Sequence, residues 1–180
     1  MFFGSSEMNI LLSILLVCCG GIVDRRETTV IVIHHSATSS GNMEIFKKFH
    51  VEERGWEDIG YHFVITNGHG GADGLIQKGR PLQKQGAHAK NSPWGDMNPY
   101  SVGICLVGED IFTEKQKIAT VLLVANLCLK YNIDPSSENI RNHHQDCPGS
   151  GLDLKEIIQE TKKFWDFFKK LQELNPTLQL

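Results

Sequence analysis

Apolar and polar residues alternate along this chain in the rhythms typical of strands and helices. Residues 28–34 (TTVIVIH) are β-branched at almost every position, which predicts a central strand covered on both faces. Residues 61–66, 74–78 and 101–107 predict three further strands. Residues 79–100 are rich in Gly, Pro, Asn and His and predict a long loop, and loops of this length in compact domains are usually functional.

Helical periodicity follows in two longer segments and one shorter segment. Thr113 and Gln116 form a capping box that predicts the start of a helix. Its predicted apolar stripe is Ile118, Val121, Leu122, Ala125 and Leu129. Asp153 predicts the start of a last helix, and residues 43–53 have a shorter helical rhythm. The apolar face of the last helix is Leu154, Ile157, Ile158, Trp165 and Phe168. Strands interspersed with helices predict a single α/β domain, with a central mixed β-sheet flanked by helices.

The N-terminal segment has a pattern of its own. Residues 10–19 read ILLSILLVCC, a run too short to span a membrane, which takes about 20 apolar residues. The run is typical of a secretory signal, so we expect a leader at 1–23, a domain at 24–180, and export to the cell envelope or extracellular space. A lipid anchor at Cys19 is a variant of this interpretation. The absence of Lys and Arg from residues 1–9 argues against a signal and leaves a cytoplasmic location as the alternative.

Composition narrows the classes of function. The chain has 180 residues, with 18 basic and 21 acidic side chains and a net charge of -3. This length predicts one domain, and a hydrophobic fraction of 41% is typical of a folded globular protein. The negative charge argues against nucleic acid as a partner. We therefore expect a monomeric globular domain whose function depends on a localised site.

Five cysteines show little sign of a disulfide framework. Cys105 and Cys128 lie in apolar segments and are predicted to be small core residues. Cys147 lies in a polar loop before Pro148, where we expect an exposed thiol. Such a thiol invites oxidation in an oxidising compartment unless something holds it, and a metal ion is one candidate.

Histidines are numerous and unevenly distributed. His34 and His35 end the first predicted strand, and His143 and His144 lie just before Cys147. A catalytic zinc site needs three protein ligands and an open position. His143 and Cys147 could supply two ligands from one turn, with His34 as the third. The spacing alone is equally compatible with exposed histidines and a spare thiol.

Several motifs together carry a family resemblance. The matching stretches are 32–38 (VIHHSAT), 55–63 (GWEDIGYHF), 86–89 (GAHA), 101–108 (SVGICLVG) and 141–148 (RNHHQDCP). In order and approximate spacing they resemble the zinc-dependent N-acetylmuramoyl-L-alanine amidases, a group that includes phage-lysozyme-type amidases and peptidoglycan recognition proteins. The resemblance runs from about Thr28 to Leu154.

This resemblance implies a site and a reaction. The ligands of Zn²⁺ would be His34, His143 and Cys147. Tyr61 would lie near the metal and donate to the oxyanion, and His88 would be a second donor or proton shuttle in the pocket. Zinc-activated water would cleave the amide between N-acetylmuramic acid and L-alanine in peptidoglycan or muropeptides. The residues that contact glycan or peptide would be Arg80, Asn91 and Trp94.

Two departures from the family pattern leave alternatives open. Relatives usually have about seven residues between the second histidine and the cysteine, and here there are three. Gln145 stands where many catalytic members have Lys or Thr. This departure weakens the prediction of a second catalytic group more than the prediction of the metal site. A non-catalytic peptidoglycan-binding module is the first alternative, although such relatives commonly lose the cysteine that is present here. A structural zinc site, closed by His144 or Asp146, is the second.

Overall fold

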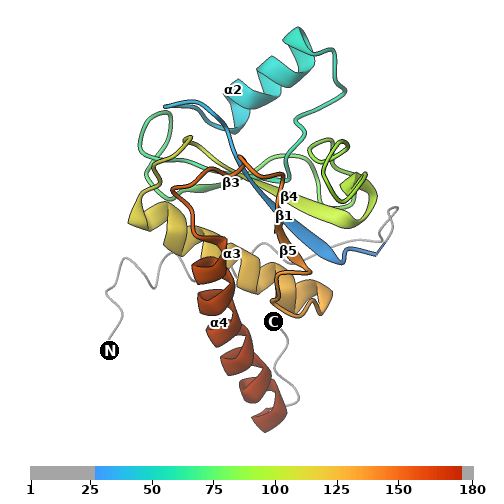
Figure 1. Cartoon of the computed structure of the whole chain (residues 1–180), viewed down its shortest axis with the longest axis vertical. Helices are drawn as coiled ribbons and strands as arrows, with labels where there is room; N and C mark the ends of the chain where they lie inside the picture. The colour runs from blue at the N-terminus through green and yellow to red at the C-terminus, as the bar shows by residue number, and fades with distance from the viewer. Residues whose placement is uncertain (1–26, 176–180) are drawn as a thin grey trace.

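The computed structural model describes residues 27–175, in which a five-stranded sheet carries helices on both faces (Figure 1). In spatial order the strands are β3 (Ile76–Lys78), β2 (Phe63–Ile65), β4 (Ser101–Leu106), β1 (Val30–His35) and β5 (Ile140–Asn142). β3 runs antiparallel to β2, and all other neighbours are parallel. The prediction of a single α/β domain with a mixed sheet is confirmed.

The two faces of β1 pack against different apolar clusters. Ile31 and Ile33 belong to the larger apolar core, whereas Val30 and Val32 pack in a second cluster on the other face. Successive side chains of a strand point to opposite faces, so His34 lies on the same face as Val32. This strand is buried on both sides, as its β-branched sequence predicts.

Helices cover the sheet unequally. α3 (Glu114–Tyr131) and α4 (Leu154–Leu174) lie on the face of the larger core, and α2 (Met43–Lys48) lies on the opposite side (Figure 1). α2 continues into a π-helical segment, η2 (Phe49–Glu53), and a short 3-10 helix, η3 (Asn98–Tyr100), precedes β4. Phe46 of α2 packs against Val64 and Cys105, which anchors α2 over the same face as His34.

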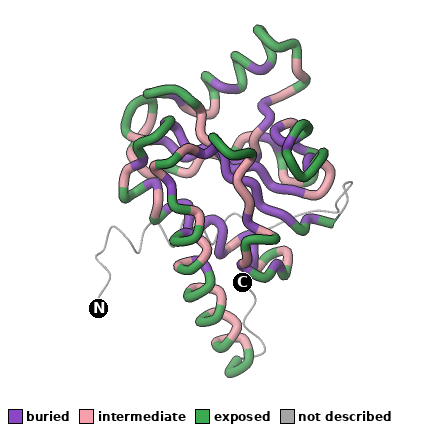
Figure 2. The backbone as a smooth tube through the Cα atoms, in the orientation of Figure 1, coloured by how far each residue is buried: buried purple, intermediate pink, exposed green. Residues whose placement is uncertain are grey.

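The capping box of α3 is confirmed, but its predicted apolar stripe is partly wrong. The Gln116 backbone N–H donates to the Thr113 hydroxyl at 3.0 Å, and the Thr113 N–H donates to the Gln116 side chain at 3.1 Å. Ile118 is 45% exposed, whereas Leu123 and Leu127 are fully buried. α3 packs between the sheet and α4, so residues on two sides of it are buried and no single stripe describes it. The distal turns of α4 are exposed or half-buried (Figure 2).

The predicted leader at 1–23 lies outside the described residues, and so does Cys19. Within residues 27–175, no helix combines the length and apolarity needed to cross a membrane.

Candidate metal centre

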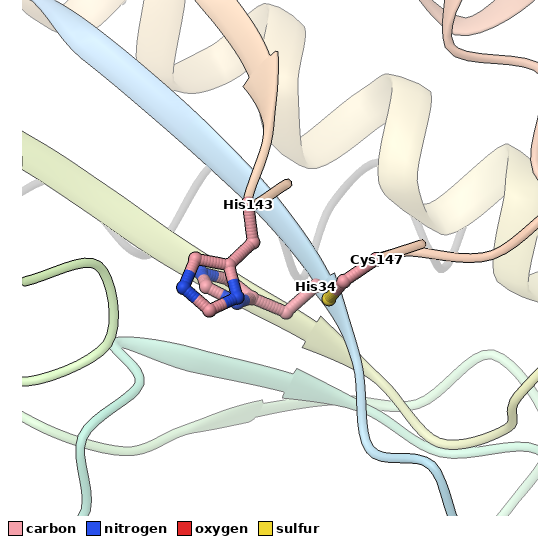
Figure 3. A group of neighbouring side chains, drawn as sticks. All are labelled: His34, His143 and Cys147. Carbon is pink, nitrogen blue, oxygen red and sulfur yellow. The ribbon is translucent and has the colours of Figure 1, made fainter. Parts of the chain in front are cut away.

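Two adjacent parallel strands bring the predicted histidine ligands together. β1 and β5 pair in the register Ile33 with Asn142, and the His143 N–H donates to the Ile33 carbonyl at 3.2 Å. That bond continues the ladder one step past β5, so His143 stands beside His34. The two rings lie with centroids 4.6 Å apart, one from each strand end (Figure 3).

A tight turn returns Cys147 to these histidines. The Cys147 N–H donates to the His144 carbonyl at 3.0 Å, and the His144 N–H donates to the Cys147 carbonyl at 3.3 Å. The short connection therefore closes a compact loop over the end of β5. The His35 N–H donates to the Cys147 thiol at 3.5 Å. Cys147 is only 5% exposed, so the prediction of an exposed thiol is wrong: its burial comes from packing against the end of β1.

The three ligand atoms have a spacing compatible with one metal ion. A nitrogen of His34, a nitrogen of His143 and the sulfur of Cys147 all lie within 4.8 Å of one another (Figure 3). Tetrahedral zinc with bonds of about 2.0–2.3 Å would hold such atoms roughly 3.5 Å apart, so only a small adjustment is needed. Two imidazoles and a thiolate favour zinc. Within the described part of the chain, neither His144 nor Asp146 joins this group. Three ligands with no fourth is the pattern of a catalytic site rather than a structural one.

The protonation states of the three candidate ligands imply that a metal ion would displace one proton from them at neutral pH. Burial, together with His88 and His143, holds the pKa of His34 well below its ordinary value. Burial, followed by His144 and His35, lowers the pKa of His143 to about 4. Both imidazoles are therefore neutral at neutral pH, which is the form that binds a cation. Burial raises the pKa of Cys147 to about 11, so its thiol keeps its proton until a cation replaces it.

Behind His34 lies a second histidine held from three sides. His88 Nδ1 is 3.0 Å from His34 Nε2, and His88 Nε2 is 3.3 Å from the Ser101 hydroxyl. The His88 backbone N–H donates to the Asn98 side chain at 2.8 Å. Its ring packs against Gly103, where an added Cβ would lie 2.6 Å from the ring. The sequence motifs did not indicate the contributions of Asn98 and Ser101.

Tyr61 lies on the other side of His34. The two ring centroids are 5.2 Å apart, and the Tyr61 hydroxyl is hydrogen-bonded to the Cys105 thiol. Cys105 is the register partner of His34 on β4, which explains how this thiol reaches the site. Burial, followed by the thiols of Cys105 and Cys147, raises the pKa of Tyr61 well above its ordinary value. The hydroxyl therefore stays protonated and can donate.

These side chains open into a cavity of about 640 Å³. One wall is the polar loop after β1, which includes Ser36 and Thr38. The other is aromatic, and its His50 ring stacks on Trp56 with centroids 4.6 Å apart. His50 is buried, its Nδ1 accepts from the Gly60 N–H at 3.3 Å, and its ring also lines the cavity.

Residues 24–150 match the family described as N-acetylmuramoyl-L-alanine amidase, which is well over half of the chain. The chain belongs to this amidase family. The resemblance found in the motifs is confirmed.

Curated members of the amidase family and its relatives match part of the chain. Peptidoglycan-recognition protein LB of Drosophila melanogaster is 36% identical over 118 residues, covering 62% of this chain and 46% of that protein. The endolysin of Escherichia phage T7 is 33% identical over 114 residues, covering 58% of this chain and 66% of that protein. The matched stretch therefore spans only part of each relative.

Solved structures of amidases and recognition proteins share the fold. The endolysin amidase LysCS from Clostridium intestinale superimposes with a TM-score of 0.65 at 27% identity, covering 80% of this chain and 90% of that chain. A mutant of Drosophila PGRP-LB in complex with tracheal cytotoxin gives a TM-score of 0.59 at 31% identity, covering 76% of this chain and 84% of that chain.

The three residues that the amidase resemblance assigns to substrate contact do not line this cavity. The Arg80 guanidinium is buried and donates to the carbonyls of Ile59 at 2.7 Å and Gln85 at 3.0 Å. Trp94 is 43% exposed, with the Arg141 guanidinium 5.4 Å from its ring centroid. Asn91 is exposed on the same loop as Trp94. The site thus brings together His34, Tyr61, His88, His143 and Cys147, while Arg80, Asn91 and Trp94 lie elsewhere.

Proposed function

We propose that this protein hydrolyses the amide bond between N-acetylmuramic acid and L-alanine in peptidoglycan or its muropeptides. The observation that carries the proposal is the group of His34, His143 and Cys147, open on one side to a cavity that also contains Tyr61. Membership of the amidase family supports this reaction class. The tracheal cytotoxin complex of a similar recognition protein supports a muropeptide ligand.

His34, His143 and Cys147 would hold a zinc ion at the base of the cavity. When bound, zinc supplies Lewis acidity that polarises a carbonyl and lowers the pKa of water toward about 7. Tyr61 keeps its hydroxyl proton and lies beside His34, so it can donate to the oxyanion that develops during amide hydrolysis. Tyr61 is therefore the proposed catalytic donor.

His88 has a different proposed role from the shuttle that the resemblance suggests. Both of its ring nitrogens have partners, His34 and Ser101, and its side chain lies behind the ligand. His34 Nε2 faces His88 Nδ1, which leaves Nδ1 of His34 to hold a metal; the His34 Nε2–H would then donate to His88 Nδ1, and the His88 Nε2–H would donate to Ser101. This chain fixes the tautomer and orientation of His34, as outer hydrogen bonds do for metal-binding histidines generally.

Proton delivery to the leaving amine needs a group other than Gln145. The Gln145 side chain is exposed and does not line the cavity, and an amide cannot transfer a proton. Two histidines next to the ligands, His35 and His144, do line it. These are the titratable groups that we propose in place of the Lys or Thr found in many catalytic relatives.

Product analysis tests the proposal directly. The protein would be incubated with purified muropeptides, with zinc in one series and a chelator in the other, and the products identified by mass spectrometry. The proposal predicts intact stem peptide with a free L-alanine amine, released only in the zinc series. Binding of muropeptide without release would contradict hydrolysis and support a recognition module instead.

A further inference from the structure

Cys105 is a buried thiol on the face of the sheet that carries the candidate metal ligands. It lies in β4, where it is the register partner of His34 on β1 and of Val64 on β2. Register partners on parallel neighbouring strands direct their side chains to the same face. Cys105 and Val64 accordingly pack with Phe46 in the apolar cluster that Tyr61 contacts. The thiol therefore adjoins the site, although it does not line the cavity itself.

The Cys105 thiol has two candidate acceptors for its proton. One is the Leu106 carbonyl, 3.9 Å from the sulfur, which already accepts from the Ser36 backbone N–H at 2.9 Å. The other is the hydroxyl oxygen of Tyr61, which is hydrogen-bonded to the thiol. A sulfur–oxygen distance of 3.9 Å is long for a hydrogen bond, so the Tyr61 oxygen is the better acceptor.

Both partners in this hydrogen bond keep their protons at neutral pH. Burial raises the pKa of the Cys105 thiol well above its ordinary value, and burial shifts the pKa of Tyr61 in the same direction. Two neutral groups with one proton each can share a hydrogen bond in two ways. Either the hydroxyl donates to the sulfur, which engages the Tyr61 proton, or the thiol donates to the hydroxyl oxygen. Only the second arrangement leaves the Tyr61 proton available to an oxyanion in the cavity.

We propose that Cys105 is a positioning residue that donates its S–H to the Tyr61 hydroxyl oxygen and leaves the Tyr61 proton free to reach the substrate carbonyl. This inference rests on the proposed function. The Tyr61 ring contacts His34 and His50, with centroids 5.2 Å and 5.5 Å away. These contacts orient the ring, and the bond to Cys105 fixes the hydroxyl at its end. A donor that is already aimed stabilises a developing oxyanion without reorganising during the reaction.

Two substitutions at Cys105 separate the hydrogen-bond donor from the volume of the side chain. Cys105→Ala removes the thiol, whereas Cys105→Ser differs little from alanine in size and keeps a hydroxyl that can donate. Cys128→Ala is the matched control, because Cys128 is equally buried but belongs to the larger core on the other face of the sheet. All variants would be made in the full chain, and the Cys105 variants also together with Tyr61→Phe.

Steady-state kinetics on the zinc-loaded protein tests the effect on hydrolysis. We expect Cys105→Ala to lower kcat roughly five-fold, with KM and bound zinc unchanged. Cys105→Ser should recover most of this loss, and Cys128→Ala should match the unmodified protein. In the Tyr61→Phe background, Cys105→Ala should not lower kcat further, because the bond that it removes is already absent. An undiminished kcat in Cys105→Ala, or an equal loss in Cys105→Ser or in the Tyr61→Phe background, would overturn the inference.

A spectroscopic measurement tests the hydrogen bond without substrate. The chain has three tyrosines, Tyr61, Tyr100 and Tyr131, so carbon-13 at the tyrosine Cζ gives three NMR signals, and Tyr61→Phe assigns one of them. Cys105→Ala should shift the Tyr61 signal, Cys105→Ser should shift it much less, and Cys128→Ala should not move it. A Tyr61 signal that is unchanged in Cys105→Ala would contradict the inference. Absence of hydrolysis by the unmodified zinc-loaded protein would instead overturn the proposed function, and the Cζ signals would still decide whether Cys105 holds Tyr61.

Discussion

Of the three candidate ligands His34, His143 and Cys147, only Cys147 must lose a proton to bind a metal at neutral pH. The two imidazoles are already neutral at neutral pH, whereas the thiol is protonated. We predict that zinc binding at about pH 6, below the pKa of about 7 that a zinc-bound water would have, releases about one proton, from Cys147. The affinity should rise about ten-fold per pH unit between the pKa of His143, about 4, and the pKa of about 7 that a zinc-bound water would have. Calorimetry in buffers of different ionisation enthalpy counts the protons. Release of two would mean that a ligand histidine is charged in the free protein.

In the proposed mechanism, Tyr61 contributes a hydroxyl and is not a metal ligand. Replacing Tyr61 by Phe removes the proposed oxyanion donor but keeps the ring that packs beside His34. We expect kcat to fall about 10²-fold, in the range measured for single oxyanion-hole donors, with the bound zinc unchanged. Steady-state kinetics combined with metal analysis measures both quantities. Loss of zinc in this variant would assign Tyr61 to the metal site instead.

The proposed role of His88 is to position His34. We predict that His88→Ala weakens zinc binding by about 10–100-fold, because His34 loses the partner that orients its ring. Competition with a zinc chelator measures the affinity. His69→Ala, at an exposed histidine outside the cavity, is the matched control and should bind zinc like the unmodified protein. An unchanged affinity in His88→Ala would leave His88 without a positioning role.

In α3, the helical periodicity of apolar residues does not by itself predict which side chains are buried. Leu123 is fully buried between the sheet and α4, and Ile118 is 45% exposed. We expect Leu123→Ala to lower the free energy of unfolding by about 2–5 kcal/mol, as for buried leucines elsewhere. Ile118→Ala should lower it by less than about 1 kcal/mol. Urea unfolding of both variants checks the order, and a larger loss at Ile118 would restore the stripe that the sequence predicts.

Local chemistry explains which elements the sequence predicted well. β1 coincides with a β-branched run, and the start of α3 coincides with a capping box, since both signals act within a few residues. Burial of Cys147 depends on the pairing of β5 with β1, which local pattern does not contain. Arg80 shows the same limit. Its guanidinium donates to carbonyls of two loops that only the folded chain brings together, and its contact with substrate stays a prediction.

The fold places the candidate metal ligands at the carboxyl-terminal ends of β1 and β5. His34 and His143 come from residues far apart in sequence that meet because β1 and β5 are parallel neighbours. The motif resemblance could predict this ligand set without the topology, but it did not predict that Asn98 and Ser101 hold His88 behind His34. The leader at 1–23, lipidation at Cys19, export and a monomeric state stay predictions.

Dependence of hydrolysis on one bound zinc is the central claim, and reconstitution tests it most directly. Chelator-treated protein would be titrated with zinc while release of stem peptide from muropeptides is followed. The rate should rise in proportion to zinc and reach a plateau at one ion per chain. Cys147→Ala, which lacks a ligand, should neither bind zinc tightly nor release stem peptide. Full activity in zinc-free protein, or in metal-free Cys147→Ala, would contradict the account.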